Sequence, residues 1–252
     1  MKLGKLFTLL FCVLVLASGC GKKEEASAPE GQQSAGTRTV DSATAGAISG
    51  KVLFSGTVPE RKELPIKGNP ECSALTHGVI LSEDLLSKDG KLQNVFVYVK
   101  KGLENYKFDV PAEAVEIDNT NCIYVPHVAG AQAGQQIKFL NNDPTLHNIH
   151  AFPKNQPGFN IGLPFQGMKQ TKKFGVEEVM VPLKCDVHPW MLGYVGILPH
   201  PYFAVSGEDG SFTIKNLPPG DYVLEAWHET LGTKELPVTV SATQTKDVEF
   251  KF

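Results

Sequence analysis

The feature that most constrains the fold is a series of short β-type runs separated by Gly and Pro. In these runs apolar and polar residues alternate, and β-branched and aromatic side chains are frequent, which is typical of strands. No apolar pattern with a period of 3.6 residues is sustained in the body of the chain, so long helices are not expected. We therefore predict an all-β fold of the sandwich or barrel type. The runs cover residues 48–56, 94–100, 115–118, 122–125, 136–140, 176–182, 194–198, 211–215, 221–227, 236–240 and 246–252.

One short helix is expected outside these runs. Ser82, followed by Glu83 and two leucines, has the pattern of a helix N-cap and predicts a helix over residues 82–86. Residues 65–70, which begin and end with Pro, are expected to form a loop.

The first twenty residues have the pattern of a secretory signal. Lys2 and Lys5 precede an apolar run over residues 6–17, which is too short to span a membrane. The ending Leu-Ala-Ser-Gly-Cys20 resembles a bacterial lipobox, although it has Ala17 where Leu is usual. The resemblance implies that 1–20 is a lipoprotein signal peptide and that Cys20 carries the lipid. The alternative is ordinary cleavage near Gly19.

The next segment predicts a tether. Residues 21–46 contain few large apolar side chains, so they cannot bury enough surface to offset their ordering entropy. We expect a flexible linker that holds a globular part near a membrane. We expect the protein to be anchored to a membrane, either facing the periplasm from the outer membrane or at the cell surface.

The charge balance excludes one class of partner. The formal charge of the whole chain is -3, and loss of the two lysines of the signal would make it -5. Basic clusters are absent from the sequence, so no nucleic-acid partner is expected.

The five cysteines separate by location. Cys12 lies in the signal, Cys20 in the lipobox, and Cys185 in a run with other metal-binding residues. Cys72 and Cys122 remain, and because an exported protein meets an oxidising environment, we predict that they form a disulfide. Their alternative use is a second metal site with His77 and His127, although that spacing suits no common zinc pattern.

A stretch near residue 185 carries the metal chemistry. Cys185, His188 and Met191 follow one another as Cys-x2-His-x2-Met, and His147 lies upstream. A trigonal plane of two His and one Cys, with a weak axial Met, is the ligand set of a blue-copper site. The sequence therefore predicts one type 1 copper ion.

Residues from about 115 to 200 resemble a cupredoxin of the amicyanin and plastocyanin type. The resemblance rests on Tyr124-Val-Pro126, residues 134–143, His147-Asn148 and the stretch around Cys185. It implies a Greek-key β-sandwich over residues 112–202. It also implies that Cys185 is the thiolate ligand, that His147 and His188 are equatorial and that Met191 is axial.

The same resemblance implies roles for neighbours of the ligands. Asn148 is expected to hydrogen-bond to the loop that contains Cys185. Pro189 lacks an N–H and cannot donate to the Cys185 sulfur. Pro189, Trp190 and Leu192 are expected to surround His188, the usual electron exit of the family, either as an apolar collar or as ordinary core.

The other histidines are not expected to bind metal. His150 should lie near the site without binding, and His127, His200 and His228 are interpreted as surface or loop residues.

A second resemblance involves the two ends of the globular part. Residues 203–224 contain Asp-Gly-x-Phe and Leu-Pro-Pro-Gly-x-Tyr, and so resemble a carboxypeptidase regulatory-like (transthyretin-like) sandwich. Residues 50–54 and 94–99 resemble its first two strands. The resemblance implies a second small β-sandwich built from 48–101 and 203–252, with the cupredoxin inserted into it. Tandem domains remain the alternative.

The leading functional hypothesis is a membrane-tethered carrier of single electrons that works with a redox partner protein. The alternatives are a copper chaperone or sequestration lipoprotein and a structural, ligand-binding sandwich. An enzyme is not expected, because four ligands leave a copper ion without an obvious open position and no other catalytic motif is present in the sequence. The oligomeric state is left open.

Overall fold

The structure is a computed structural model that describes residues 38–252. The expected signal peptide, the expected lipid acceptor Cys20 and residues 21–37 of the expected linker lie outside the described residues. In residues 38–252 no helix is long and apolar enough to cross a membrane.

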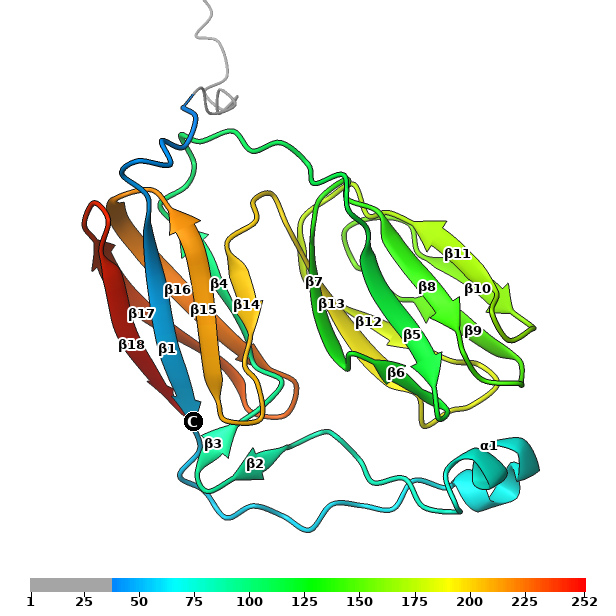
Figure 1. The fold of residues 1–252 in the computed structure, drawn as a ribbon. Helices are drawn as coiled ribbons and strands as arrows, with labels where there is room; N and C mark the ends of the chain where they lie inside the picture. The colour runs from blue at the N-terminus through cyan, green and yellow to red at the C-terminus, as the bar shows by residue number, and fades with distance from the viewer. Residues whose placement is uncertain (1–37) are drawn as a thin grey trace, which may run out of the picture. The chain divides into compact units, whose positions relative to one another are not determined.

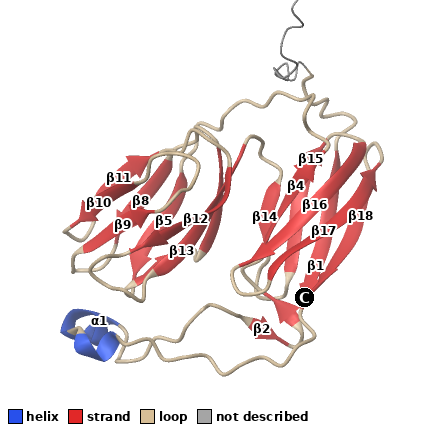
Figure 2. Ribbon diagram, turned by 180° about the vertical axis from the view of Figure 1, so that it is seen from behind, coloured by secondary structure: helices blue, strands red, loops and turns tan. Residues whose placement is uncertain are grey.

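The described residues form an all-β fold, as predicted from the alternating runs (Figure 1). Figure 2 shows strands in red throughout and α1 in blue within a long connection. The two helical elements are η1 (Ile66–Gly68) and α1 (Pro70–Leu75). The strands are β1 (Gly46–Leu53), β2 (Ser87–Lys88), β3 (Lys91–Leu92), β4 (Phe96–Lys101), β5 (Val115–Thr120), β6 (Ile123–Val125), β7 (Val128–Gln132), β8 (Ile137–Asn141), β9 (His147–Ala151), β10 (Phe159–Leu163), β11 (Lys169–Lys172), β12 (Glu178–Lys184), β13 (Leu192–Leu198), β14 (Phe203–Val205), β15 (Ser211–Leu217), β16 (Gly220–His228), β17 (Gly232–Val240) and β18 (Thr245–Lys251).

Strands from the two ends of the globular part share two sheets, which we call the flanking sandwich. One sheet has the order β15-β1-β3-β2, with β18 also paired to β1, and the other has the order β14-β4-β16-β17. β1 pairs antiparallel with β15 and parallel with β18, so Gly50 lies opposite both Phe212 and Val248. β1 is therefore completed by strands more than 150 residues later and β4 by strands more than 100 residues later, so these sheets interleave the two ends of the globular part.

The strands from β5 to β13 form the other two sheets, which we call the central sandwich. Their orders are β10-β9-β12-β13-β7 and β11-β8-β5-β6. In the first sheet β9 pairs antiparallel with β12, placing Ala151 opposite Leu183 and His150 opposite Lys184. This register brings the start of β9 close to the end of β12.

Each sandwich has its own apolar core. Ile48, Val97 and Leu224 belong to the core of the flanking sandwich, and Ile117 and Phe139 to that of the central one. A third cluster joins residues of both sandwiches: Phe96, Tyr98, Val128, Met180 and Leu198. Because all of these side chains are at most 8% exposed, their burial is a main source of stability.

The helix predicted for residues 82–86 is wrong. The segment 54–86 between β1 and β2 contains its only α-helix at residues 70–75, inside and beyond the expected loop. Asn69 explains the start, because its side chain accepts the Cys72 N–H at 2.9 Å and Pro70 occupies the first helical position. Leu85, from the expected helix, instead packs into the core of the flanking sandwich.

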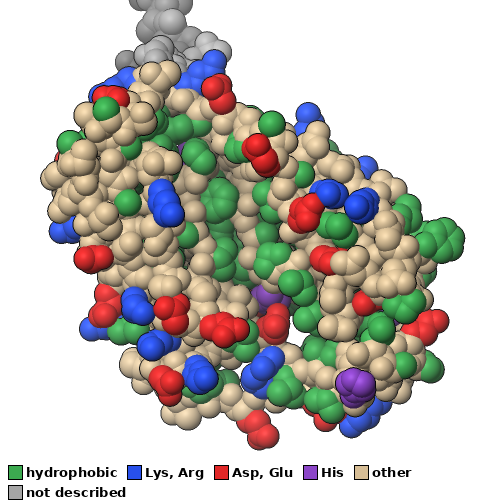
Figure 3. Space-filling view, in the orientation of Figure 1, with side chains coloured by type: hydrophobic (Ala, Val, Ile, Leu, Met, Phe, Trp, Pro, Cys, Tyr) green, Lys and Arg blue, Asp and Glu red, His purple; other side chains and the backbone are tan. Residues whose placement is uncertain are grey.

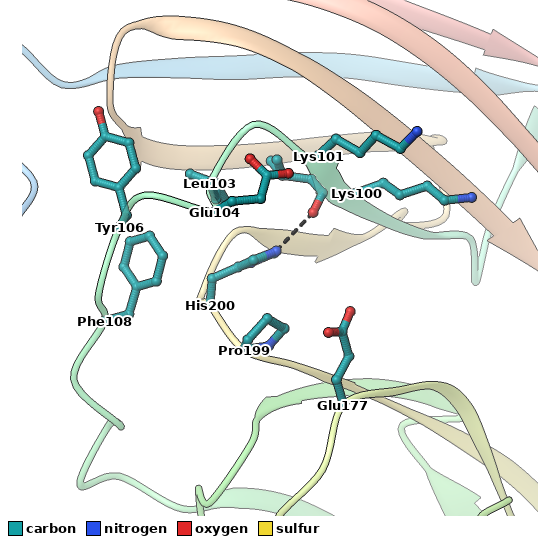
Figure 4. A pocket seen from close by; sticks show the side chains of 10 residues that line it. Lys100, Lys101, Leu103, Glu104, Tyr106, Phe108, Glu177, Pro199 and His200 are labelled. Carbon is teal, nitrogen blue, oxygen red and sulfur yellow. Dashed lines mark hydrogen bonds between the residues drawn. The ribbon is translucent and has the colours of Figure 1, made fainter. Parts of the chain in front are cut away.

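Of the three histidines interpreted as surface or loop residues, His127 and His200 do lie in connections between strands and His228 lies in β16, but none of them is exposed. His200 and His228 are 6% and 1% exposed, and the ring of His127 is buried against Glu229. Figure 4 shows His200 beside a pocket, with its ring nitrogen donating to the backbone; the bond is 2.8 Å long and runs from Nε2 to the oxygen of Val99. The residues that line this pocket include Tyr106 and Phe108 but none of the four expected metal ligands.

His200 gives the folding stability a defined pH dependence. Burial lowers its pKa to about 4 from the ordinary 6.5, despite the opposing hydrogen bond to Val99. Between these pH values the unfolded chain binds more protons than the native one, so stability should fall as the pH drops from about 6.5 to about 4. Denaturant titrations at pH 7 and 4.5 measure the free energy of unfolding. Its decrease between these two pH values should be smaller in His200→Gln than in the wild type. The exposed His77→Gln is the control, and an equal loss in all three proteins would contradict the assignment to His200.

Charged side chains of both signs are interspersed over the face of the molecule in Figure 3. Several are paired: Lys100 contacts both Glu225 and Glu235, and Lys138 contacts Glu116.

Candidate metal centre

Three of the four expected ligands come together at one end of the central sandwich. His147 is the first residue of β9, Cys185 follows the last residue of β12, and His188 lies in the connection from β12 to β13. The pairing of β9 with β12 places these positions side by side. His147, Cys185 and His188 form one group whose ligand atoms all lie within 4.8 Å of one another.

The distances suit a shared ion. Nδ1 of His147 lies 3.0 Å from Nδ1 of His188, and the sulfur of Cys185 lies 3.8 Å from the same His188 nitrogen. Two imidazole nitrogens bound at about 2.0–2.1 Å to one ion lie roughly 3 Å apart when the angle at the ion is near 90°. A thiolate bound at about 2.3 Å lies roughly 3–4 Å from each of them. The distances among the three residues are therefore compatible with one shared metal ion.

Met191 completes the expected set in sequence and lies close by. It immediately precedes β13, is 1% exposed, and packs in the same apolar cluster as Cys185. Its N–H donates to the carbonyl of His188 at 2.9 Å, which closes the short turn between these two residues. The turn thus ties the thioether to the same loop as Cys185 and His188.

Asp143 orients His147. A carboxylate oxygen of Asp143, itself 2% exposed, lies 2.9 Å from Nε2 of His147. An Nε2–H that donates to this carboxylate leaves Nδ1 free to face Cys185 and His188, the usual arrangement around a metal-binding histidine. Burial pushes the pKa of His147 down, but the hydrogen bonds and charges of Asp143 and Cys185 together outweigh burial and raise the pKa overall.

The same carboxylate holds the turn between β5 and β6. Its two oxygens each accept one backbone N–H, from Asn121 and Cys122, at 2.8 Å. Both turn residues have a left-handed backbone, with φ of 55° and 57°. Such a two-residue hairpin turn is usually made by Asn and Gly, so the carboxylate stabilises a conformation that Cys122 rarely adopts. Asp143 thereby links Cys122 to His147.

Asn148 makes the contact that the resemblance implies. Its side-chain oxygen accepts the Asp186 N–H at 2.7 Å and lies 3.2 Å from the Cys185 sulfur. Its amide nitrogen donates to Asn160 and Asp186. His150 also contacts Asp186, at 3.0 Å, and lies outside the group of ligand atoms. These contacts from β9 hold Asp186, the residue after Cys185.

The surroundings favour the thiolate of Cys185. Burial alone raises its pKa, but hydrogen bonds from His147, His188 and the Asn148 N–H reverse the effect and bring the pKa to about 6, from the usual 9.0. Since the thiolate is the form that binds metals, the chain prepares Cys185 as a ligand.

His188 is covered, which differs from the expected electron exit. It is 0% exposed. Its Nε2 lies 3.1 Å from the amide nitrogen of Asn69, and the Trp190 ring lies 5.1 Å from its own ring. Trp190 donates from Nε1 to the carbonyl of Cys122. Among the residues expected to surround His188, Trp190 contacts its ring, whereas Pro189 is exposed.

The cover is helix α1, attached by a disulfide. Cys72 on α1 and Cys122 on the β5–β6 turn are bonded and both 0% exposed. This bond uses both cysteines of the alternative site with His77 and His127, and His77 is exposed on the segment after α1. The structure therefore supports the disulfide reading.

Sequence reasoning missed Asp143 and Asn69. Asp143 had a local signal, because a carboxylate four residues before a candidate ligand can reach its ring. Asn69 had none: it lies 119 residues before His188, and only the folding of segment 54–86 brings them together.

No family model matches the chain, and no curated protein matches it in sequence. Among solved structures, a purple cupredoxin from Nitrosopumilus maritimus is 24% identical over 33% of this chain and 98% of its own, with a TM-score of 0.29. An oxidised mutant of amicyanin is 19% identical over 33% of this chain and 81% of its own, with a TM-score of 0.30. A copper-containing nitrite reductase from Thermus scotoductus SA-01 is 19% identical over 38% of this chain, with a TM-score of 0.32, and the match spans 26% of that reductase. These likenesses concern part of the fold and carry no argument about activity; the regulatory-like sandwich and the lipoprotein signal have no counterpart among them.

Proposed function

We propose that His147, Cys185, His188 and Met191 hold one copper ion and that the protein carries single electrons. The main support for this proposal is that two imidazole nitrogens and one thiol lie within 4.8 Å of one another. The three residues that carry them are each at most 3% exposed. Soft thiolate and imidazole together suit both copper oxidation states.

Copper, when bound, would supply a one-electron couple. The work of the chain is to keep the ligands in place as the charge changes. Asp143 holds the His147 ring and Asn148 holds the backbone after Cys185, so neither ligand depends on the ion for its position. Burial excludes water from all three ligand atoms and so limits rearrangement of solvent when an electron arrives or leaves.

We propose a carrier and not an enzyme, because the ligand residues are buried and other side chains cover them, which hinders direct contact with a substrate. His188 is covered by Asn69 and Trp190, and His147 by Asp143. Electrons can cross such a cover without contact between ligand and partner, whereas a substrate cannot.

We further propose that the protein is exported and anchored by a lipid on Cys20, and that its partner is a redox protein. The signal-like pattern of residues 1–20 and a disulfide between Cys72 and Cys122 support export, since disulfides persist in oxidising compartments.

Visible and EPR spectra of the copper-loaded protein test the central proposal. An intense absorption toward the red end of the visible spectrum is expected, and a colourless protein that binds no copper would refute it. Electron self-exchange measured by NMR separates the carrier from a copper chaperone. Negligible self-exchange together with fast Cu(I) transfer to an acceptor would favour the chaperone.

Asn69→Asp should strengthen copper binding. A histidine that binds metal through Nδ1 carries its proton on Nε2, but Nε2 of His188 faces the amide nitrogen of Asn69, which is also a donor. The Asn69 oxygen is engaged with the Cys72 N–H. A carboxylate would accept from both groups and still cap α1, so Cu(II) affinity should rise about tenfold and the reduction potential should fall.

The matched control is Asn69→Ser, which keeps a capping side chain but is too short to reach His188. Competition titration and voltammetry measure affinity and potential. If Asn69→Asp behaves like Asn69→Ser, the contact with His188 does not influence the centre.

A further inference from the structure

We propose that Cys72 and Cys122, once reduced, form with His188 a second metal site, which receives Cu(I) and lies directly beside the His147–Cys185–His188 centre. The destination of the copper rests on the proposed function; the existence of the second site does not.

Cys72, Cys122 and His188 together supply a donor set that suits Cu(I). The sulfur atoms of Cys72 and Cys122 and a ring nitrogen of His188 all lie within 4.8 Å of one another. Each of the three residues is 0% exposed. Two thiolates and an imidazole are soft ligands of the kind that select Cu(I). In the disulfide form the sulfurs are bonded to each other and cannot serve as thiolate ligands.

The second site shares a residue with the His147–Cys185–His188 centre. His188 belongs to the group with Cys72 and Cys122 and also to the group with Cys185. The sulfur of Cys122 further lies within 4.8 Å of ligand atoms of Asp143 and His147. An ion can thus move from one group to the other by exchanging ligands one at a time, without leaving the buried interior.

Access to the second site depends on how firmly α1 is held against the central sandwich. Helix α1 has only six residues, and apart from the disulfide its polar contacts with the central sandwich are few. Asn69 contacts His188, and Glu71 accepts a hydrogen bond from the Thr145 hydroxyl. With the disulfide cut, these two polar contacts and the burial of Ile66 and Cys72 are what hold the short segment, so its local opening costs less than in the disulfide form. The reduced form admits copper, and the disulfide form keeps the centre closed.

The redox step balances with a dithiol as the reductant. The dithiol gives two electrons and two protons to the Cys72–Cys122 bond and becomes a disulfide itself. Binding of Cu(I) to the two thiols releases their protons. Return to the closed form takes two electrons and two protons away, to an oxidised dithiol, by the reverse exchange.

The full chain carrying Cys185→Ser tests the site in isolation from the proposed blue-copper centre. Its disulfide form and its phosphine-reduced form are titrated without oxygen with Cu(I) against a chromophoric Cu(I) chelator. We expect the reduced form to bind one Cu(I), at least about tenfold more tightly than the disulfide form. Equal affinity in the two forms would overturn the proposal.

Adding Cys72→Ser or Cys122→Ser to this background should remove the extra affinity of the reduced form. Circular dichroism shows whether each variant folds. Protection of the thiols from alkylation is a second measurement that needs no substitution at Cys72 or Cys122. Bound Cu(I) should protect both thiols of the reduced Cys185→Ser protein from alkylation, measured by mass spectrometry. Unprotected thiols at saturating Cu(I) would contradict the site. A wild-type protein that is colourless with copper while these results hold would refute only the blue-copper centre.

Discussion

Cys185→Ser is expected to abolish the intense visible absorption of the copper-loaded protein and to weaken copper binding by more than about 100-fold. The thiolate is the strongest ligand of the set, and loss of even an outer partner of a metal ligand typically costs 10–100-fold. The serine hydroxyl fits the buried position of Cys185, so the fold should persist. Visible spectroscopy and competition titration measure the two effects.

Met191→Gln is the matched variant on the same loop. A Gln oxygen can replace the weak axial thioether, so the protein should keep its copper and its colour while the reduction potential shifts. If Cys185→Ser retained the absorption, or if Met191→Gln lost copper as completely as Cys185→Ser, the assignment of these two ligands would be wrong.

Removal of the disulfide, by Cys72→Ala with Cys122→Ala, should lower the free energy of unfolding by about 4 kcal/mol. The bond closes a loop whose ends are 50 residues apart, and the chain-entropy account gives this magnitude for such a loop. Folded domains are stable by about 5–15 kcal/mol, so the variant should fold but with a much lower denaturation midpoint.

Urea titration of the oxidised proteins measures this loss. Ser73→Ala, a neighbour of Cys72 on α1, is the control and should change stability by less than about 1 kcal/mol. A loss below about 1 kcal/mol in the double variant would contradict the chain-entropy account of this disulfide.

Local patterns predicted most of the strands and the residues of the candidate centre. The alternating runs at 115–118 and 136–140 correspond to β5 and β8, because side chains of a strand point alternately to the buried and the exposed face of the sheet. The spacing of Cys185, His188 and Met191 confines them to one connection between paired strands, β12 and β13. The helix predicted for 82–86 does not form, because a capping pattern of a few residues contributes less stability than the burial of Leu85 in the core of the flanking sandwich.

The amino-acid sequence by itself determined the β-type runs, the donor residues and the position of Asn148 beside His147. Tertiary structure alone decided that β1 pairs with β15 and β18, that Asp143 holds both His147 and the Cys122 turn, and that Asn69 covers His188. The physical reason is the distance along the sequence between the residues that interact. Side-chain burial leaves a periodic signal within each strand, whereas contacts between residues far apart depend on sheet order and register, which no local stretch encodes. The enclosure of the candidate centre by α1 is therefore a property of the folded chain.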